Sequence, residues 1–318
     1  MRILILLLSV VNLSAYAQSA YQQAWQSLNK NSKTEAKQLL EKAMEDPLTA
    51  EDAYITSLYL STYDGKETGI SDFAKRFYQK SSNPYPYLHA LWFNGAVMGD
   101  YGKKSPHQVQ LANLLINDTK APGSIVASAN YQLGLHQVSS NQFDKASKYY
   151  SAIGNIRNWQ YTGPFENLSE SGFDKDYGPL KHPEPTAVFR SLTNAEVKWF
   201  TPPAENPDGW TPTSYSINKT TAVAYAQNFV NSAADQTVYC NVGFTGNIKV
   251  WINDELVISE SQERITDFDA YTARCNLKKG TNRVLVQLGY TDTNYPNFSL
   301  RFTDEAFHVV PGITGSSS

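Results

Sequence analysis

The stretch IKVWINDELV at residues 248–257, followed by YTARCNLKKGTNRVLVQL at residues 271–288, decides the fold of this chain. In the first segment Ile248, Val250 and Ile252 alternate with residues of the opposite face, which is the period of two of a β-strand with one buried face. Asn253 and Asp254 follow, and both residue types tolerate positive φ. The segment therefore predicts two antiparallel strands joined by a tight hairpin turn.

Four more segments in this half of the chain alternate in the same way. Their predicted inward-facing residues are Val238, Cys240, Val242 and Phe244; Ala273, Cys275 and Leu277; Val284, Val286 and Leu288; and Phe298, Leu300 and Phe302. Lys279 and Gly280 break the pattern between two of these strands. A succession of short alternating strands predicts an antiparallel β-sandwich with these side chains in its core.

Length and composition limit the class of protein. The chain has 318 residues, which is enough for two domains with substantial cores. Its formal net charge is -3, its pI is about 6.0, and no long run of one sign occurs, so we expect neither nucleic acid nor an anionic membrane surface as a partner. Aromatic residues make up 13%, with 20 Tyr, a content usual for β-sandwiches and for sugar-binding surfaces.

The first 17 residues, MRILILLLSVVNLSAYA, have the features of a secretory signal peptide. Arg2 precedes an apolar run from Ile3 to Leu8, and small residues stand at Ala15 and Ala17, which predicts cleavage after Ala17. An anchor helix is the alternative, but the run is shorter than the roughly 20 residues that a span needs. We therefore expect an exported protein, periplasmic or extracellular, that does not insert into a membrane after cleavage.

Export places the two cysteines, Cys240 and Cys275, where a disulfide could persist. Both residues face inward in the strand pattern, and their strands could be neighbours. Two unpaired thiols that serve as small core residues are an equally weighted alternative. Neither cysteine has a His or a second Cys at metal-ligand spacing, so no metal role is expected.

Apolar residues recur with helical period from about residue 21 to residue 150. Thr49 and Asp52 resemble a capping box that opens one helix. Ser105 opens another, with a proline at the first helical position, and Pro122 opens a third. Short helices separated by short breaks predict antiparallel helical hairpins stacked side by side.

The segment at residues 129–150 has the spacing of a tetratricopeptide repeat, with Leu133, Gly134, Phe143, Ala146 and Tyr150 at the characteristic positions. The two small residues let paired helices approach closely, while Phe143 and Tyr150 are expected to fill the space between hairpins. The pattern predicts a degenerate array of three or four hairpins. A plain helical bundle is the alternative.

The composition of the sequence changes at Asn158. From there on the sequence is rich in Gly, Pro and aromatic residues and has no helical period. Residues 159–162 predict a first strand, followed by long ordered loops. The predicted organisation is a signal peptide at 1–17, a helical domain at 18–156, a β-sandwich at 157–310 and a C-terminal tail at 311–318.

Two phrases in the loop region, WQYTGPFEN at residues 159–167 and SGFDKDYGPL at residues 171–180, carry a family resemblance. They resemble segments of secreted multidomain bacterial proteins in which tetratricopeptide-like helices precede a galactose-binding-domain-like jelly roll. The matching positions are Trp159, Gly163, Pro164, Phe165, Glu166, Asn167, Gly172, Phe173, Asp174, Tyr177 and Pro179. Residues 250–257 and 277–289 match later strands of that jelly roll, with Asp254 where glycine is usual.

The resemblance implies a multidomain α plus β chain, with a helical repeat array followed by an antiparallel jelly roll. In those proteins a transglutaminase-like region commonly follows the jelly roll. The segment after Phe302 is too short for such a region. We therefore expect either a short relative or the front part of a larger transglutaminase-like or peptidase-like protein.

The sequence predicts no catalytic, metal or cofactor site, and a structural calcium has no support. The five histidines are His89, His107, His136, His182 and His308, and none has a zinc-type partner. A triad of Cys275 with His308 is disfavoured because Cys275 faces inward from mid-strand. Asp267 and Asp269 could be a carboxylate pair, although a solvated turn explains them more simply.

Binding is the better supported reading, because sandwiches of this kind place ligands on loops at one end. The candidate ligand-binding residues are Trp210, Tyr215, Tyr290, Asp292, Asn294 and Tyr295, and Asn297 is a further polar residue close to Tyr295. The alternative is that such aromatic residues seal the sandwich, as expected for Trp159, Trp199 and Trp251. Two functions follow: a non-catalytic exported interaction protein whose helices bind protein or peptide with the sandwich as platform, or a carbohydrate-binding module that takes a glycan on its loops.

Overall fold

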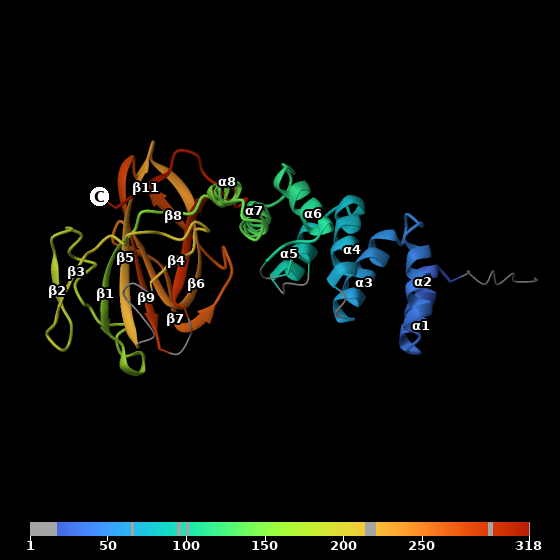
Figure 1. Cartoon of the computed structure of the whole chain (residues 1–318), viewed down its shortest axis with the longest axis horizontal. Coiled ribbons are helices and arrows are strands. Elements are labelled where there is room, and N and C mark those ends of the chain that lie inside the picture. The colour runs from blue at the N-terminus through green and yellow to red at the C-terminus, as the bar shows by residue number, and fades with distance from the viewer. Residues whose placement is uncertain are drawn as a thin grey trace, which may run out of the picture. The chain divides into compact units, whose positions relative to one another are not determined.

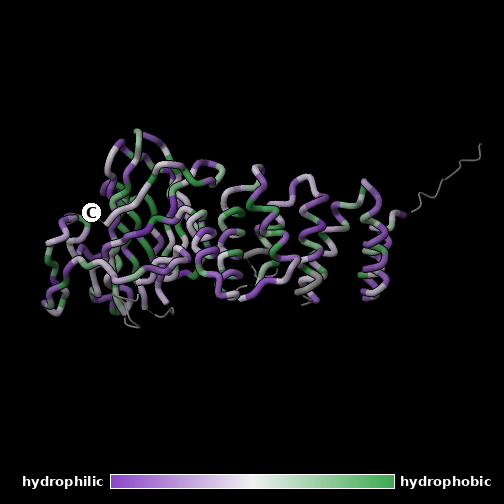
Figure 2. The backbone as a smooth tube through the Cα atoms, turned by 45° about the horizontal axis from the view of Figure 1, so that its top comes forward, coloured by the Kyte–Doolittle hydropathy of each residue, from purple (hydrophilic) through white to green (hydrophobic). Residues whose placement is uncertain are grey.

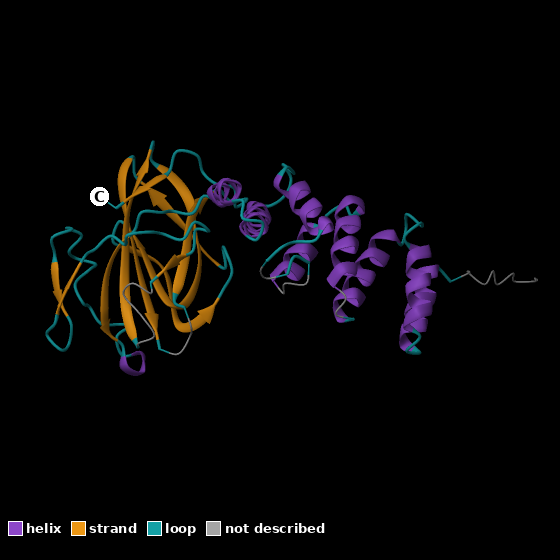
Figure 3. Cartoon of the chain, in the orientation of Figure 1, coloured by secondary structure: helices purple, strands orange, loops and turns teal. Residues whose placement is uncertain are grey.

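The computed structural model describes residues 18–64, 67–93, 97–99, 102–213, 221–291 and 295–317. The predicted signal peptide at residues 1–17 lies outside this part of the chain. Helices come first and an antiparallel sheet follows, as predicted (Figure 3). Within the described residues, no helix is both long and apolar enough to span a membrane.

The helices are α1 (Ala20–Asn29), α2 (Lys33–Ala43), α3 (Ala50–Tyr63), α4 (Glu67–Lys80), α5 (Tyr85–Phe93), α6 (Pro106–Ile116), α7 (Gly123–Val138) and α8 (Phe143–Ile153). Ser105 caps α6 through a reciprocal pair of hydrogen bonds with Gln108, at 3.3 and 2.8 Å. The capping box predicted at Thr49 is wrong in one respect. Thr49 is the N-cap of α3, but its hydroxyl donates to the Ala43 carbonyl at 3.0 Å instead of accepting from the helix.

The chain forms two compact units, Met1–Leu88 and His89–Ser318. In the first unit α1 packs against α2 and α3 against α4. The small buried residues Ala24, Ala43 and Ala53 surround Leu40 there, so the helices pack at close range. In the second unit, α7 and α8 lie beside the sheet, and α6 packs against α7 (Figure 1). The boundary between units thus falls within the helical segment.

The close approach predicted for α7 and α8 is confirmed. A Cβ atom on Gly134 would lie 2.2 Å from Cε1 of Tyr150, so only glycine fits between these two helices. Ala146 and Tyr150 are buried. The expectation for Phe143 is wrong, because its side chain is 62% exposed and fills no space between hairpins. It is the first residue of α8, where its ring lies beyond the packed face.

The strands are β1 (Gln160–Glu166), β2 (Val188–Arg190), β3 (Glu196–Lys198), β4 (Thr211–Pro212), β5 (Ala222–Ser232), β6 (Gln236–Ile252), β7 (Glu255–Ile265), β8 (Tyr271–Leu277), β9 (Gly280–Tyr290), β10 (Asn297–Thr303) and β11 (Thr314–Ser316). Apart from the small β2–β3 pair, they form one curled antiparallel sheet with the order β1-β5-β9-β6-β10-β4. β11 joins β5, while β7 and β8 both join β6.

The 17-residue strand β6 is the centre of the sheet. Its first half pairs with β8 and β10, and its second half pairs with β7 and β9. The change of partners falls at Gly246, which has φ of 126°. A Cβ atom there would lie 2.5 Å from the Gly289 carbonyl oxygen, so glycine is required where the sheet curls.

The core enclosed by the curled sheet is the one predicted from alternation. All the inward-facing residues named above, from Val238 to Phe302, contribute to one apolar cluster or pack against it. Hydrophobic residues accordingly follow the strands of this unit in Figure 2. Asn253 and Asp254 both have positive φ, at 49° and 67°, which confirms the predicted hairpin turn.

The opposite face of the sheet is covered as well. Residues of the two phrases at 159–180 fold over it, and Phe165 stacks on Tyr177 with ring centroids 4.6 Å apart. Trp199 and Trp251 join this second cluster, and Trp159 lies in the first with no exposed surface. The three tryptophans are therefore structural, as expected.

Candidate ligand-binding site

The first residue of helix α7 is fixed to the segment that follows β10. The Gly123 N–H donates to the Ala306 carbonyl at 2.8 Å, and a Cβ atom on Gly123 would lie 1.9 Å from the Phe307 carbonyl oxygen. After α8, the Ile156 N–H donates to the Leu300 carbonyl at 2.8 Å. The α7–α8 hairpin is thus attached to the sheet at both ends, which positions one side of α7 as a wall facing the strands.

A buried ion pair reinforces this attachment. Arg301 of β10 has a side chain only 2% exposed and binds both carboxylate oxygens of Asp269, whose side chain is 4% exposed. The same guanidinium donates to the carbonyl of Ile153 at 3.1 Å and to those of Gly123 and Phe307, each at 3.3 Å. One cation therefore joins the sheet, the end of α8 and the start of α7.

The predicted solvated turn at Asp267 and Asp269 is wrong for Asp269, because Arg301 holds it in the protein interior. Asp267 is exposed, as expected. The two carboxylates therefore have different environments, because Asp269 is paired with Arg301 and Asp267 is exposed.

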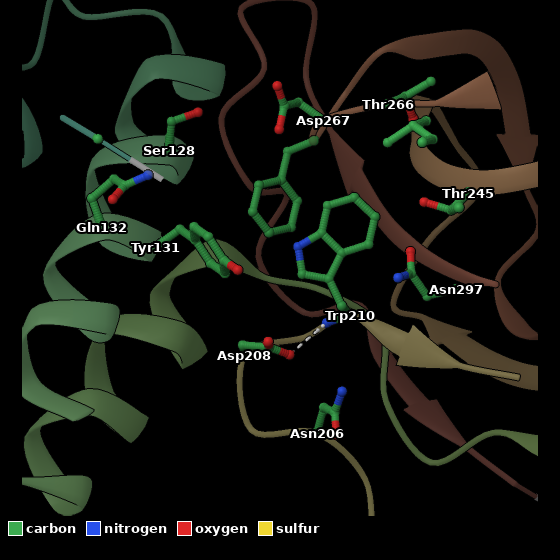
Figure 4. Close-up of a pocket in the computed structure, with 13 residues that line it drawn as sticks. Ser128, Tyr131, Gln132, Asn206, Asp208, Trp210, Thr245, Thr266, Asp267 and Asn297 are labelled. Atoms are coloured by element: carbon green, nitrogen blue, oxygen red, sulfur yellow. Dashed lines mark hydrogen bonds between the residues drawn. The ribbon is translucent and has the colours of Figure 1, made fainter. Parts of the chain in front are cut away.

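A cleft of about 440 Å³ opens between α7 and the sheet (Figure 4). Its lining residues are Gly99, Ser128, Tyr131, Gln132, Asn206, Asp208, Trp210, Thr245, Ile265, Thr266, Asp267, Phe268 and Asn297. They come from the α5–α6 connection, α7, the loop before β4, the strand β6, the end of β7, the β7–β8 connection and β10. The volume is in the range of small-ligand sites, roughly 300 to 1,000 Å³.

Three aromatic rings stand at the centre of the cleft. Phe268 lies between Trp210, at 4.9 Å between ring centroids, and Tyr131, at 5.1 Å. The far edge of the indole rests on β6 at Gly243, where a Cβ atom would lie 2.9 Å from Cη2 of Trp210. The indole Nε1 points toward the α7 side in Figure 4, and no residue in the described part of the chain accepts its hydrogen. Trp210 thus presents an aromatic surface and one free donor.

The polar side chains of the cleft carry amide, hydroxyl and carboxylate groups. Gln132 is 8% exposed, and its Oε1 has no hydrogen-bond partner among the described residues. The same holds for Oδ1 of Asn297 on the opposite wall. Oδ1 of Asp208 accepts a hydrogen bond from the backbone N–H of Trp210 at 3.0 Å. Burial raises the pKa of Asp208, while Arg157 and the backbone hydrogen bond act against this shift.

The structure brings together only part of the predicted loop site. Trp210 lines the cleft, but Tyr290 is 5% exposed and packs with Ala222 and Ala224 in the sheet. Tyr295 is 77% exposed and lies outside the lining. The predicted residues Tyr215, Asp292 and Asn294 lie outside the described part of the chain.

The cleft residues of α7 could not be identified from sequence. Ser128, Tyr131 and Gln132 lie within a helical repeat pattern, where each is explained by packing or by a solvated face. Phe268 lies in a loop with no other indication. Trp210, in a loop rich in proline, and Asn297, beside the predicted loop aromatics, are the two lining residues that the sequence does indicate.

Both cysteines are buried, unpaired thiols in the structure. They lie on the neighbouring strands β6 and β8, where Cys275 pairs with Val238, two residues from Cys240. Burial raises the pKa of Cys275 to about 11, which is the opposite of what an activated nucleophile needs. His308 is not beside Cys275, since it contacts the Ala121 carbonyl at 3.0 Å. A disulfide between the cysteines stays a prediction.

No metal-binding group of three or more His, Cys, Asp or Glu residues occurs within the described ranges.

No family model matches the sequence, and no curated protein is similar enough to count as a relative.

Solved structures give low similarity. A family 35 carbohydrate-binding module from an environmental isolate is 19% identical over 32% of this chain and 76% of its own, with a TM-score of 0.24. The PA14 domain of an antifreeze protein is 13% identical over 51% and 90%, with a TM-score of 0.27. A β-glucosidase from Kluyveromyces marxianus is 14% identical over 46% and 16%, with a TM-score of 0.29. At these scores the similarities identify no function.

Proposed function

We propose that this chain is a non-catalytic carbohydrate-binding protein whose ligand occupies the cleft between α7 and the sheet. The observation that carries the proposal is the combination, in one cleft, of a partly exposed indole with hydroxyl and amide side chains on the surrounding walls. Sugar rings stack on aromatic faces, and their hydroxyls form hydrogen bonds with such polar groups.

Other side chains of the cleft suit the same ligand. Thr245 and Thr266 lie on the sheet side and Ser128 on α7, and Figure 4 shows them on opposite sides of the indole. Short hydroxyl and amide groups hydrogen bond in either direction, as sugar hydroxyls do. The Thr266 hydroxyl is already paired, since it donates to the Phe244 carbonyl at 3.0 Å and accepts the Phe244 N–H at 2.7 Å. A mainly apolar ligand would leave the hydroxyls of Thr245 and Ser128 without partners at a cost of about 1 to 3 kcal/mol each.

The test is titration calorimetry of the mature chain against a panel of oligosaccharides, starting from hits on a glycan array. Trp210→Phe retains a ring against Phe268 but removes the indole donor, and Gln132→Leu removes an acceptor. Each variant should weaken binding about 2- to 12-fold, since a lost hydrogen bond costs about 0.5 to 1.5 kcal/mol.

Tyr295→Ala is the matched control, because this exposed ring belongs to the loop site predicted from sequence and lies outside the cleft. It should leave the affinity unchanged. A loss of binding in Tyr295→Ala, with Trp210→Phe unaffected, would instead indicate that the glycan binds at the loop site predicted from sequence. Absence of saturable binding to any glycan would refute the proposed function.

Peptide binding by the helices is a second candidate, with a separate observation in its favour. Trp25 of α1 and Tyr59 and Tyr63 of α3 are 46%, 46% and 81% exposed. The two helices meet where the Tyr21 hydroxyl lies 3.1 Å from Oγ1 of Thr56. Exposed Trp and Tyr are the residues most enriched at binding hot spots.

The test is selection from a random peptide library. Binding that is lost in Tyr59→Ala and retained in Leu48→Ala, a change at a 90% exposed residue, would support this role. Equal peptide binding by both variants would refute a peptide-binding role for these helices. The role of accessory region in a larger transglutaminase-like or peptidase-like protein stays a prediction.

A further inference from the structure

The charged side chains that line the cleft are both acidic, Asp208 and Asp267. Asp208 is the more confined of the two, and one of its oxygens accepts the Trp210 N–H. No side chain in the described part of the chain donates to its second oxygen. A carboxylate with reduced access to water and an unused acceptor is stabilised by a cationic donor from a ligand.

Protein cations do not occupy that position. Arg157 is the cation that acts on Asp208, but its guanidinium donates to the Pro207 carbonyl at 2.5 Å and forms no ion pair with the carboxylate. Tyr150 also lies near Asp208 and carries no charge at neutral pH, and burial raises its pKa further, from 10.0 to about 12. Asp208 thus retains capacity for one more donor on its cleft side, next to the Trp210 indole (Figure 4).

We propose that the cleft prefers carbohydrates that carry a protonated amine, and that Asp208 is the group that binds this amine. The proposal rests on the proposed function and specifies its ligand class as amino sugars with a free amino group. The amide side chains of Gln132 and Asn297 place further polar groups on the walls of the same cleft. The adjacent indole face also attracts a cation.

The test compares three ligands of equal length: an oligomer of glucosamine, its N-acetylated form, and a neutral glucose oligomer with the same linkage. Acetylation removes the charge and leaves the sugar backbone in place. We expect the amine form to bind at least about tenfold more tightly than either of the others at neutral pH and low salt, because a hydrogen bond to a charged group is the stronger kind. The preference should decrease as salt is added.

Asp208→Asn is the diagnostic variant, since asparagine keeps an oxygen that accepts the backbone N–H of Trp210 and removes the negative charge. It should abolish the preference for the amine while neutral oligomers bind as before. Asp144→Asn, which changes an exposed carboxylate on α8 outside the cleft lining, changes net charge equally and should retain the preference.

The outcomes separate this inference from the proposed function. Neutral and amine-bearing oligomers that bind equally to the unaltered chain would overturn the inference and leave carbohydrate binding intact. Equal loss of preference in Asp144→Asn would also overturn it, because the effect would then arise from net charge. Absence of binding by all three ligands and by the wider glycan panel would overturn both.

Discussion

Replacement of Arg301 by methionine should destabilise the second compact unit by about 3 to 5 kcal/mol. Methionine matches the length of the aliphatic part of arginine but leaves the Asp269 carboxylate, 4% exposed, without its cation. The carbonyls of Ile153, Gly123 and Phe307 lose their donor at the same time. The expected change in melting temperature is a fall of roughly 6 to 20 °C, at about 2 to 4 °C per kcal/mol for a unit of this size.

The assay is urea unfolding followed by circular dichroism, together with amide hydrogen exchange. Arg190→Met is the matched control, because its ion pair with Glu196 is more than half exposed on both sides and should contribute at most about 1 kcal/mol. Exchange should increase most in α7 and α8, which Arg301 joins to the sheet. The double variant Arg301→Met with Asp269→Asn should cost less than the sum of the single changes, since neither then leaves a buried charge unpaired. A loss below 1 kcal/mol for Arg301→Met, or strict additivity in the double variant, would refute the reasoning.

Three further predictions concern packing and ionisation. Gly134→Ala should destabilise the chain by about 1 to 3 kcal/mol in urea unfolding, despite the better helix propensity of alanine, because the added Cβ would meet the Tyr150 ring at 2.2 Å; a stabilised variant would contradict this. The Cys275 thiol should react with iodoacetamide roughly 100-fold more slowly in the folded chain than in urea at pH 8, because its pKa is raised from 9.0 to about 11; an intact mass that changes on reduction would instead reveal a disulfide. The pKa of His136 is lowered, chiefly by burial, and its Nδ1 accepts the Lys104 N–H at 3.1 Å. The neutral form is therefore favoured by folding, so this contribution to stability is present above the ordinary pKa of 6.5 and is lost as the pH falls below it. His136→Asn should reduce the slope of unfolding free energy against pH below 6.5, and an unchanged slope would count against the role of His136.

The strand core was predictable from sequence because alternation is a local property. Val250 and Phe302 are far apart along the chain, yet each was placed inside by its immediate neighbours alone. Arg301 shows where the same logic fails. It lies between Leu300 and Phe302, so alternation places it on the outer face and predicts exposure. That face is covered by α7 and α8, a contact that depends on the three-dimensional arrangement of distant segments.

The cleft could not be predicted for the same reason. Its walls come from α7 and from loops more than 70 residues further along the chain, where Asp208 and Asp267 each look like ordinary turn residues. Trp210 was selected because it is an aromatic residue in a loop, but its partner across the cleft, Gln132, lies within a helical pattern. Gly134, in contrast, was correctly interpreted, since a glycine at a fixed offset from an aromatic residue in a paired helix has a local packing reason.

Because the α7–α8 hairpin is attached to the sheet, it forms a fixed wall of the cleft and is more than a spacer. Gly123 permits backbone contact at the start of α7, and Arg301 binds the start of α7 and the end of α8 to one strand. A wall held at both ends keeps Gln132 opposite the indole of Trp210, so the proposed binding would not require ordering of the cleft. Preorganisation of this kind reduces the entropy lost on binding. We therefore expect the ion pair at Asp269 to contribute to affinity through geometry, although neither of its partners lines the cleft.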